Sequence, residues 1–189
     1  TNEKGSNNIA IGFEALEVQN FTTVTNSYNT AIGHATGAAI TTGVRNTLVG
    51  GLVGDALIDA DYNVAMGYYS LGGDTYGSKS TALGYYTLAS QNFTTAADGY
   101  NIAIGYTAGE DITTGIENTL VGSNSGKELI DADYNVSMGI AALAADTYGS
   151  KSTALGSFAL FTQNFTTATE TFNTAVGFNA GKLVTTGIK

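Results

Sequence analysis

Few residues in this chain are of the types that perform acid–base, nucleophilic or metal chemistry. Its 189 residues include one histidine, His34, and no cysteine. His34 therefore has no second histidine or thiol with which to hold zinc or to activate a nucleophile. We expect a solvent-exposed structural role for it. No carboxylate pair can be assigned to acid–base catalysis from spacing alone, so the sequence predicts no enzyme and no cofactor.

Two acidic pairs recur in the phrase Leu-Ile-Asp-Ala-Asp-Tyr-Asn: Asp59 with Asp61, and Asp131 with Asp133. Alternate carboxylates on a turn are candidate calcium ligands, because calcium prefers oxygen. However, the glycine-rich nonapeptide of calcium-binding β-rolls is missing. Turn formation, in which Asp bonds nearby backbone amides, is the favoured interpretation, and no metal site is predicted.

Four sequences match the N-glycosylation pattern, at Asn20, Asn92, Asn135 and Asn164. Three of them recur because a longer unit recurs, which favours structural loop residues over glycosylation sites. A set of tyrosines follows a repeated glycine, and these rings suit either stacking on receptor sugars or ladders between neighbouring units. The tyrosines are Tyr68, Tyr69, Tyr85 and Tyr86.

The elements that carry these residues repeat at two nested periods. A five-residue phrase, Asn-x-small-aliphatic-Gly, recurs at steps of 17 or 21 residues, and one 21 with three 17s gives a 72-residue super-repeat. A period near 20 indicates small units that bury their apolar faces only by stacking. The phrases begin at Asn8, Asn29, Asn46, Asn63, Ser80, Asn101, Asn118, Asn135, Ser152 and Asn173.

We number each unit, or rung, from its Asn or Ser. Positions 2 and 4 share one face of a short strand, and position 4 is expected to form one buried structural core line: Ile11, Ile32, Val49, Met66, Leu83, Ile104, Val121, Met138, Leu155 and Val176. Position 3 is Ala in seven rungs, Ser in one and Leu at Leu48 and Leu120. Such small residues predict close contact with neighbouring subunits.

Position 5 is always glycine, which predicts a corner with positive φ or no space for Cβ. These corner glycines are Gly12, Gly33, Gly50, Gly67, Gly84, Gly105, Gly122, Gly139, Gly156 and Gly177. Beyond the corner, each rung carries one large apolar residue, either Leu at position 9 or an aliphatic at position 12 when position 9 is Gly. The 21-residue rungs add Phe21, Phe93 and Phe165, expected to cover the longer loops.

The fold predicted is all-β: a parallel β-solenoid or left-handed β-roll of about ten rungs, forming a single repetitive segment over residues 1–189. Both ends lack polar capping units, so we expect a piece of a longer fibre. A net charge of −9 argues against nucleic acid and anionic membranes as partners. No apolar run long enough to insert into a membrane occurs.

The phrases Asn29-Thr-Ala-Ile-Gly33, Ser80-Thr-Ala-Leu-Gly84 and Asn173-Thr-Ala-Val-Gly177 resemble the head repeats of trimeric autotransporter adhesins, which form trimers of left-handed β-rolls. The longer phrase Asn173–Gly181, followed by Thr185-Thr-Gly187, resembles repeats of phage tail fibres that precede an endosialidase-type chaperone domain. The resemblance implies a homotrimer and an extracellular location, on a virion fibre or a bacterial surface.

The function expected is non-enzymatic: a stiff fibre spacer that offers a multivalent surface to a host glycan or protein receptor. A first alternative is a subunit of a self-assembling extracellular filament, since uncapped ends invite strand addition. An ice-binding solenoid is less favoured, because Thr pairs such as Thr41-Thr42 occur in only some rungs. A calcium-binding solenoid is also less favoured.

Overall fold

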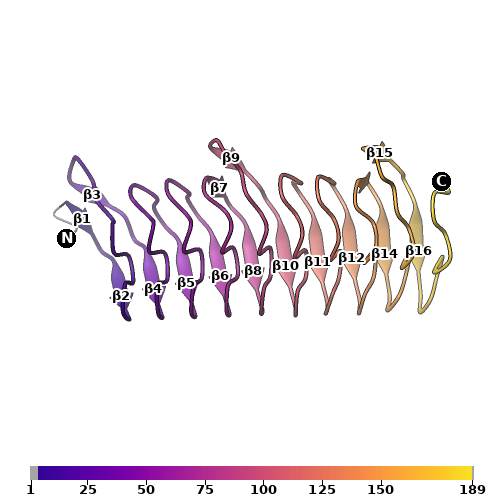
Figure 1. The fold of residues 1–189 in the computed structure, drawn as a ribbon, viewed down its shortest axis with the longest axis horizontal. Helices are drawn as coiled ribbons and strands as arrows, with labels where there is room; N and C mark the ends of the chain where they lie inside the picture. The colour runs from indigo at the N-terminus through magenta and orange to yellow at the C-terminus, as the bar shows by residue number, and fades with distance from the viewer. Residues whose placement is uncertain (1–3, 189) are drawn as a thin grey trace.

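The computed structural model describes residues 4–188, and this part of the chain is a parallel β-solenoid of about ten turns with no helix. The coils lie side by side in a single row, with the two termini at opposite ends (Figure 1). The all-β fold and the stacking of the repeats are therefore as predicted. None of the described residues forms a helix suited to cross a membrane.

One three-residue strand from every rung joins a single ten-stranded parallel sheet. Each strand covers positions 2 to 4, and position 3 pairs with position 3 of the next rung throughout, as Ala103 does with Ala82 and Leu120. The strands are β2 (Ile9–Ile11), β4 (Thr30–Ile32), β5 (Thr47–Val49), β6 (Val64–Met66), β8 (Thr81–Leu83), β10 (Ile102–Ile104), β11 (Thr119–Val121), β12 (Val136–Met138), β14 (Thr153–Leu155) and β16 (Thr174–Val176).

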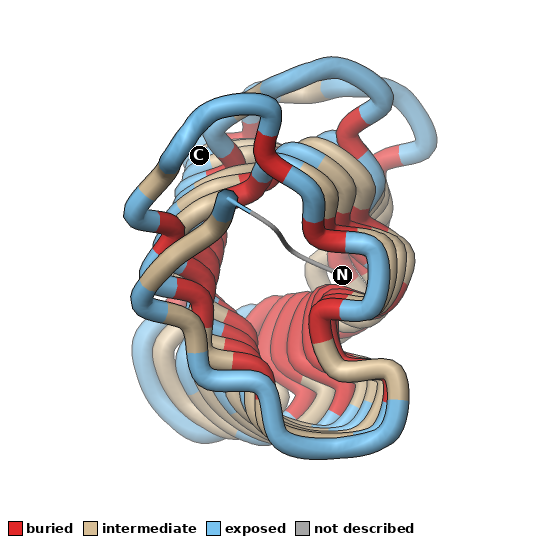
Figure 2. The backbone as a smooth tube through the Cα atoms, turned by 90° about the vertical axis from the view of Figure 1, so that its left-hand side faces the viewer, coloured by how far each residue is buried: buried red, intermediate tan, exposed pale blue. Residues whose placement is uncertain are grey.

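The long rungs add three two-stranded parallel sheets, spaced by the super-repeat. They are β1 (Gly5–Ser6) with β3 (Thr25–Asn26), β7 (Gly77–Ser78) with β9 (Ala97–Asp98), and β13 (Gly149–Ser150) with β15 (Thr169–Glu170). Seen end-on, the coils superimpose on one outline, from which the longer loops project (Figure 2).

The corner glycines have the predicted backbone, with φ between 125° and 145°. Their carbonyl groups lie directly over the glycine of the rung before. A Cβ built on Gly50 would lie 1.8 Å from the carbonyl oxygen of Gly67, far inside van der Waals contact. Any side chain at this corner would therefore push adjacent coils apart.

The facing predicted for the strand was wrong. Position 3 points into the solenoid, and Ala103 and Leu120 are fully buried. Position 4 points outward: Ile104 is 37% exposed, and Met66 and Met138 are 45% exposed. In the single chain, position 4 is exposed at Ile11, Met66, Ile104, Met138 and Val176 and intermediate at Ile32, Val49, Leu83, Val121 and Leu155. Position 3 is small because the coil is narrow and its interior is already filled from the opposite wall.

That filling comes from positions 9 and 12, as predicted. The position-9 leucines Leu71, Leu88 and Leu143 are fully buried, and so are the position-12 aliphatics Ile40, Leu57, Ile112 and Leu129. Position 9 has a left-handed backbone in every rung, with φ of 52° at Leu71 and 53° at Gly54. Gly adopts this conformation freely, whereas a non-Gly residue is strained by roughly 1–2 kcal/mol. Leu occurs there only where it supplies the core side chain.

The two large position-3 residues fill the space left by consecutive Gly rungs. A Cβ on Gly37 would lie 3.0 Å from Leu48 Cδ1, and one on Gly54 would lie 3.4 Å from the same atom. Likewise, Cβ atoms on Gly109 and Gly126 would lie 2.8 and 2.7 Å from Leu120 side-chain atoms. These leucines therefore keep the core at constant density.

Candidate interaction surface

The outward face of the ten-stranded sheet is the most extensive candidate site in the described part of the chain. Positions 2 and 4 supply two outward side chains per rung, in register along the whole sheet. Position 2 is Thr, Val or Ile and position 4 is always aliphatic. The face has no charged side chain. It is apolar in every rung at position 4, whereas position 2 is Thr in six of the ten rungs. We call this face the apolar strip, and extended apolar surface of this kind marks interaction sites on soluble proteins.

The apolar strip continues past the glycine corner at position 6. Aromatic or aliphatic residues stand there in six rungs, and several are among the most exposed large side chains of the protein. Phe13 is 69% and Phe178 is 73% exposed. The six are Phe13, Tyr68, Tyr85, Tyr106, Ile140 and Phe178. Apolar and aromatic side chains thus extend past the corner in six of the ten rungs, and the other four rungs have His, Gly or Ser there.

A ladder of alternating aromatic and charged residues immediately precedes the Asn or Ser of successive rungs. The backbone of these residues is left-handed, with φ between 48° and 62°. Each of three cations lies over the aromatic ring of the next rung, 5.1–5.4 Å from its centroid: Arg45 over Tyr62, Lys79 over Tyr100 and Lys151 over Phe172. Sequence reasoning missed this ladder, although it can be read one residue before each phrase. Its members are Tyr28, Arg45, Tyr62, Lys79, Tyr100, Glu117, Tyr134, Lys151 and Phe172.

The asparagine that opens most rungs is buried and stitches adjacent rungs together. Asn46 Nδ2 donates to the Ala60 carbonyl at 2.7 Å, and Asn46 Oδ1 accepts the backbone N–H of Asn63 at 3.0 Å. The same two kinds of bond recur at Asn29 and Asn118. These asparagines are structural, because their side-chain amides hydrogen-bond backbone groups.

At two of the three long rungs, a buried Gln at position 12 bonds a buried Asp at position 12 of the preceding 17-residue rung. Gln91 Nε2 donates to Asp74 Oδ2 at 2.6 Å, and Gln91 Oε1 accepts from Asn101 Nδ2 at 2.9 Å. Asp74 Oδ1 also accepts the backbone N–H groups of Gly77 and Phe93. The set Asp146, Gln163 and Asn173 repeats this arrangement 72 residues later. Phe21, Phe93 and Phe165 are buried in the three long rungs, as expected.

The four acidic candidates for calcium form two pairs that lie 72 residues apart in the chain. Each of the four carboxylates accepts a hydrogen bond from the preceding rung. Asp61 Oδ1 accepts the Val44 N–H at 2.8 Å and Asp133 Oδ1 accepts the Ile116 N–H at 2.8 Å. Asp59 accepts from Thr42, and Asp131 from Thr114. Burial raises the pKa of Asp61 and Asp133. Nowhere in residues 4–188 do three His, Cys, Asp or Glu side chains gather as a metal-ligand set.

The remaining candidates lie separately along the rod. His34 is exposed and stacks on Phe13 at 5.7 Å between ring centroids. Among the N-glycosylation matches, Asn20 and Asn92 are exposed, whereas Asn135 is buried within the asparagine ladder. The Thr pairs at 41–42 and 113–114 bond the next rung, as Thr41 does to the Ile58 carbonyl.

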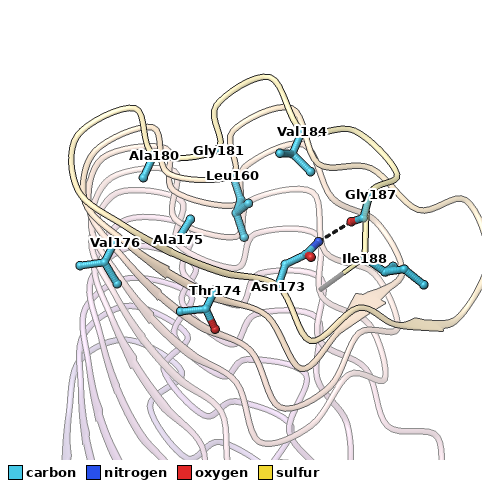
Figure 3. Close-up of a pocket in the computed structure, with 10 residues that line it drawn as sticks. All are labelled: Leu160, Asn173, Thr174, Ala175, Val176, Ala180, Gly181, Val184, Gly187 and Ile188. Carbon is cyan, nitrogen blue, oxygen red and sulfur yellow. Dashed lines mark hydrogen bonds between the residues drawn. The ribbon is translucent and has the colours of Figure 1, made fainter.

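A hollow of about 410 Å³ opens at the last rung (Figure 3). Its apolar lining includes Leu160, Ala175 and Val184, which hold positions 9, 3 and 12 of their rungs. Asn173 Nδ2 donates to the Gly187 carbonyl across it at 2.6 Å. The hollow is thus the cross-section of the solenoid core and contains the same bonds as the inner rungs.

Comparison of the chain with known protein families, with curated proteins and with solved structures finds no match.

Proposed function

We propose that this protein is a non-enzymatic spacer segment of an extracellular fibre, in which three parallel copies pack through the outward face of the ten-stranded sheet. The observation that carries the proposal is the apolar strip of positions 2 and 4. A monomer would leave this whole strip in water, and contiguous exposed apolar surface of this kind is uncommon on proteins that act alone.

The shape of the apolar surface favours three copies over two. A face-to-face dimer covers one flat wall of each coil. Around a three-fold axis parallel to the rod, each copy meets two neighbours on adjoining walls, which suits an apolar surface that bends past the corner to Phe13, Tyr85 and Phe178. Equal rungs then meet at equal heights, so the position-4 side chains of the three copies form layers.

A spacer role follows from the bonding along the axis. Every rung is joined to the next by the main sheet and by the corner backbone, and most are joined also by a buried asparagine bond, which resists bending. Three such rods, with their loops repeated along the outer surface, would present many copies of a weak binding site to a host glycan or protein receptor. An acidic surface is unsuited to nucleic acid.

The test is the mass of the chain in solution, measured by light scattering and sedimentation across a range of concentrations up to millimolar. We expect the mass of three chains. The double variant Met66→Lys/Met138→Lys, which places cations in the apolar strip, should have the mass of one chain and keep its β circular dichroism. Thr42→Lys/Thr114→Lys, on exposed loops, is the matched control and should remain trimeric.

A single-chain mass of the unmodified protein at every concentration would contradict the proposal. A two-chain mass would replace the three-fold arrangement with a face-to-face dimer. Masses that rise with concentration without a plateau would favour end-to-end filament growth. In that case the Met66/Met138 variant would still polymerise, because its rung edges are unchanged.

A further inference from the structure

Five tyrosines on three consecutive rungs form one continuous ring stack. Tyr68 and Tyr69 follow β6, Tyr85 and Tyr86 follow β8, and Tyr106 follows β10. Tyr85 is the hub, with ring centroids 5.9 Å from Tyr68, 4.6 Å from Tyr86 and 5.3 Å from Tyr106. Tyr86 also contacts Tyr69 at 5.0 Å and Tyr68 at 6.0 Å. We call these five residues the tyrosine stack.

The solenoid itself does not require the tyrosine stack. The equivalent positions 72 residues later belong to the same kinds of rung and have the same backbone, but they contain no tyrosine. Ile140, Ala141 and Ser157 occupy three of them, and Phe158 and Phe178 the other two. The five phenols are therefore a local addition to a repeat that folds without them.

The geometry of the stack limits what it can do. Tyr85 and Tyr106 are within 5° of parallel, and Tyr68 and Tyr85 within 17°. Tyr85 has a stacked ring on each side, so its two faces are covered, it presents its edge to solvent, and it is poorly placed to stack on a sugar. Tyr68, Tyr85 and Tyr106 are nevertheless exposed, which leaves their hydroxyls and neighbouring ring carbons open to small oxidants and to enzymes.

We propose that the tyrosine stack is a site of oxidative phenol coupling, which joins adjacent rungs covalently when a haem peroxidase and hydrogen peroxide act on the chain before it assembles. Two neighbouring phenols each lose one electron and one proton, and the resulting phenoxyl radicals form a carbon–carbon bond between ring positions next to the hydroxyls. The ring hydrogens at the new bond then move to the two oxygens. One peroxide molecule takes up the two electrons and two protons and leaves as two waters.

Proximity is what distinguishes these tyrosines from the others. The solenoid holds several pairs of phenols in contact, so coupling becomes intramolecular and avoids the entropic cost of bringing two radicals together. In a chain without cysteine, such bonds would do between rungs what a disulfide does elsewhere.

The position of Lys79 allows a direct test. Trypsin cuts after Lys79, which separates Tyr68 and Tyr69, in peptide 46–79, from Tyr85, Tyr86 and Tyr106, in peptide 80–127. The whole chain is treated with peroxidase and peroxide at low protein concentration, digested, and mapped by tandem mass spectrometry together with dityrosine fluorescence. We expect peptides 46–79 and 80–127 to be joined with loss of two hydrogen atoms, the bonds mapping to the tyrosine stack.

Two single variants make the test specific. Tyr85→Phe keeps the ring but removes the hub phenol, so the Tyr68–Tyr85 and Tyr85–Tyr106 products should be lost while a Tyr69–Tyr86 product remains. Tyr134→Phe is the control: Tyr134 is as exposed as Tyr85, at 46% against 45%, and no aromatic partner is found for it among the described residues. Its removal should leave the products unchanged.

Cross-links spread evenly over Tyr28, Tyr62, Tyr134 and the tyrosine stack would overturn the proposal, since proximity would then confer no selectivity. Failure to join the two peptides while Tyr134 becomes oxidised would also overturn it. Retention of the selective pattern in denaturant would show that the solenoid geometry is not its cause. The oxidation is run at a protein concentration at which light scattering gives the mass of one chain. The test is therefore independent of the proposed trimer, in which the wall that holds Tyr85 would meet a neighbour.

Discussion

Neighbouring residues of one strand have opposite roles in this protein. Ala103 lies inside the coil, where its methyl group is fully buried, and Ile104 lies on the outer strip. Ala103→Asp would place an unpaired carboxylate in the core and should lower the free energy of unfolding by about 3–5 kcal/mol. Ile104→Asp should cost about 1 kcal/mol or less in dilute, monomeric protein.

Chemical denaturation of the two variants measures this difference. A larger loss for Ile104→Asp than for Ala103→Asp would mean that the strand faces the other way. In concentrated protein, Ile104→Asp should instead reduce assembly, because its carboxylate enters the apolar strip.

Asp55 is a carboxylate in an unfavourable place. Its Oδ1 is buried without a hydrogen-bond partner, and burial raises its pKa from 3.8. Because the folded-state pKa is above the unfolded one, ionisation weakens the fold as pH rises through this range. Asp55→Asn should therefore raise the melting temperature at pH 7. The gain should vanish below pH 3.8, where the carboxyl group is protonated in both states.

Thermal melts between pH 3 and pH 8 check this prediction, with Asp59→Asn on the surface as the control. A stabilisation by Asp55→Asn that is equal at all pH values would show that ionisation of Asp55 is not its source.

At the scale of the rung, the choice between Leu and Gly at position 9 depends on two factors. One is the core volume left by the residue at position 12, and the other is the left-handed backbone at position 9. Gly54 lies opposite Leu57, and a Cβ on Gly54 would lie 2.7 Å from Leu57 Cδ1. Gly54→Leu alone should destabilise the protein by about 1–3 kcal/mol through overpacking, added to the strain of a left-handed leucine.

The double variant Gly54→Leu/Leu57→Ala should recover much of that loss, because it converts the rung from the position-12 type to the position-9 type. A double-mutant cycle measures the coupling. Strictly additive losses in the two single variants would contradict the idea that the two positions share one space in the core.

The long rungs depend on their buried polar pair. Gln91→Leu leaves Asp74 Oδ2 and Asn101 Nδ2 without the glutamine amide, and each orphaned group costs about 1–3 kcal/mol. We expect a lower unfolding free energy together with faster proteolysis of the loop at residues 92–100. The control is Asn92→Ala, on the same loop but exposed. Equal effects of Gln91→Leu and Asn92→Ala would contradict the assignment.

At the scale of the molecule, the sequence predicted the architecture because each rung repeats the same stacking problem. The invariant glycine indicated the corner, and the exchange between Leu71-type and Leu57-type residues indicated one core side chain per rung. These features are local and recur in phase, so the spacing alone reveals them.

The facing of the strand could not be obtained in the same way. Alternation separates positions 2 and 4 from position 3, but it does not say which set points inward. Aliphatic residues ordinarily indicate the core, and here the narrow coil reverses the rule, because Leu57 and its equivalents already fill the interior from the opposite wall. The left-handed backbone of Tyr62, Lys79 and other non-glycine residues could not be predicted either, because these residue types do not indicate a positive φ.

Because the sheet has the same register at every rung, the chain can gain or lose one whole 72-residue unit without a change in how its rungs stack. Because Asn46 and Asn118 begin equivalent rungs, deletion of residues 46–117 would join Arg45 to Asn118 and place an equivalent rung on each side of the junction. We expect this shortened chain to fold with unchanged β circular dichroism and a shorter rod in small-angle scattering, whereas deletion of 60 residues should fail. Unequal recombination between 72-residue units could then lengthen or shorten a fibre in whole steps, without passing through an unfolded intermediate sequence.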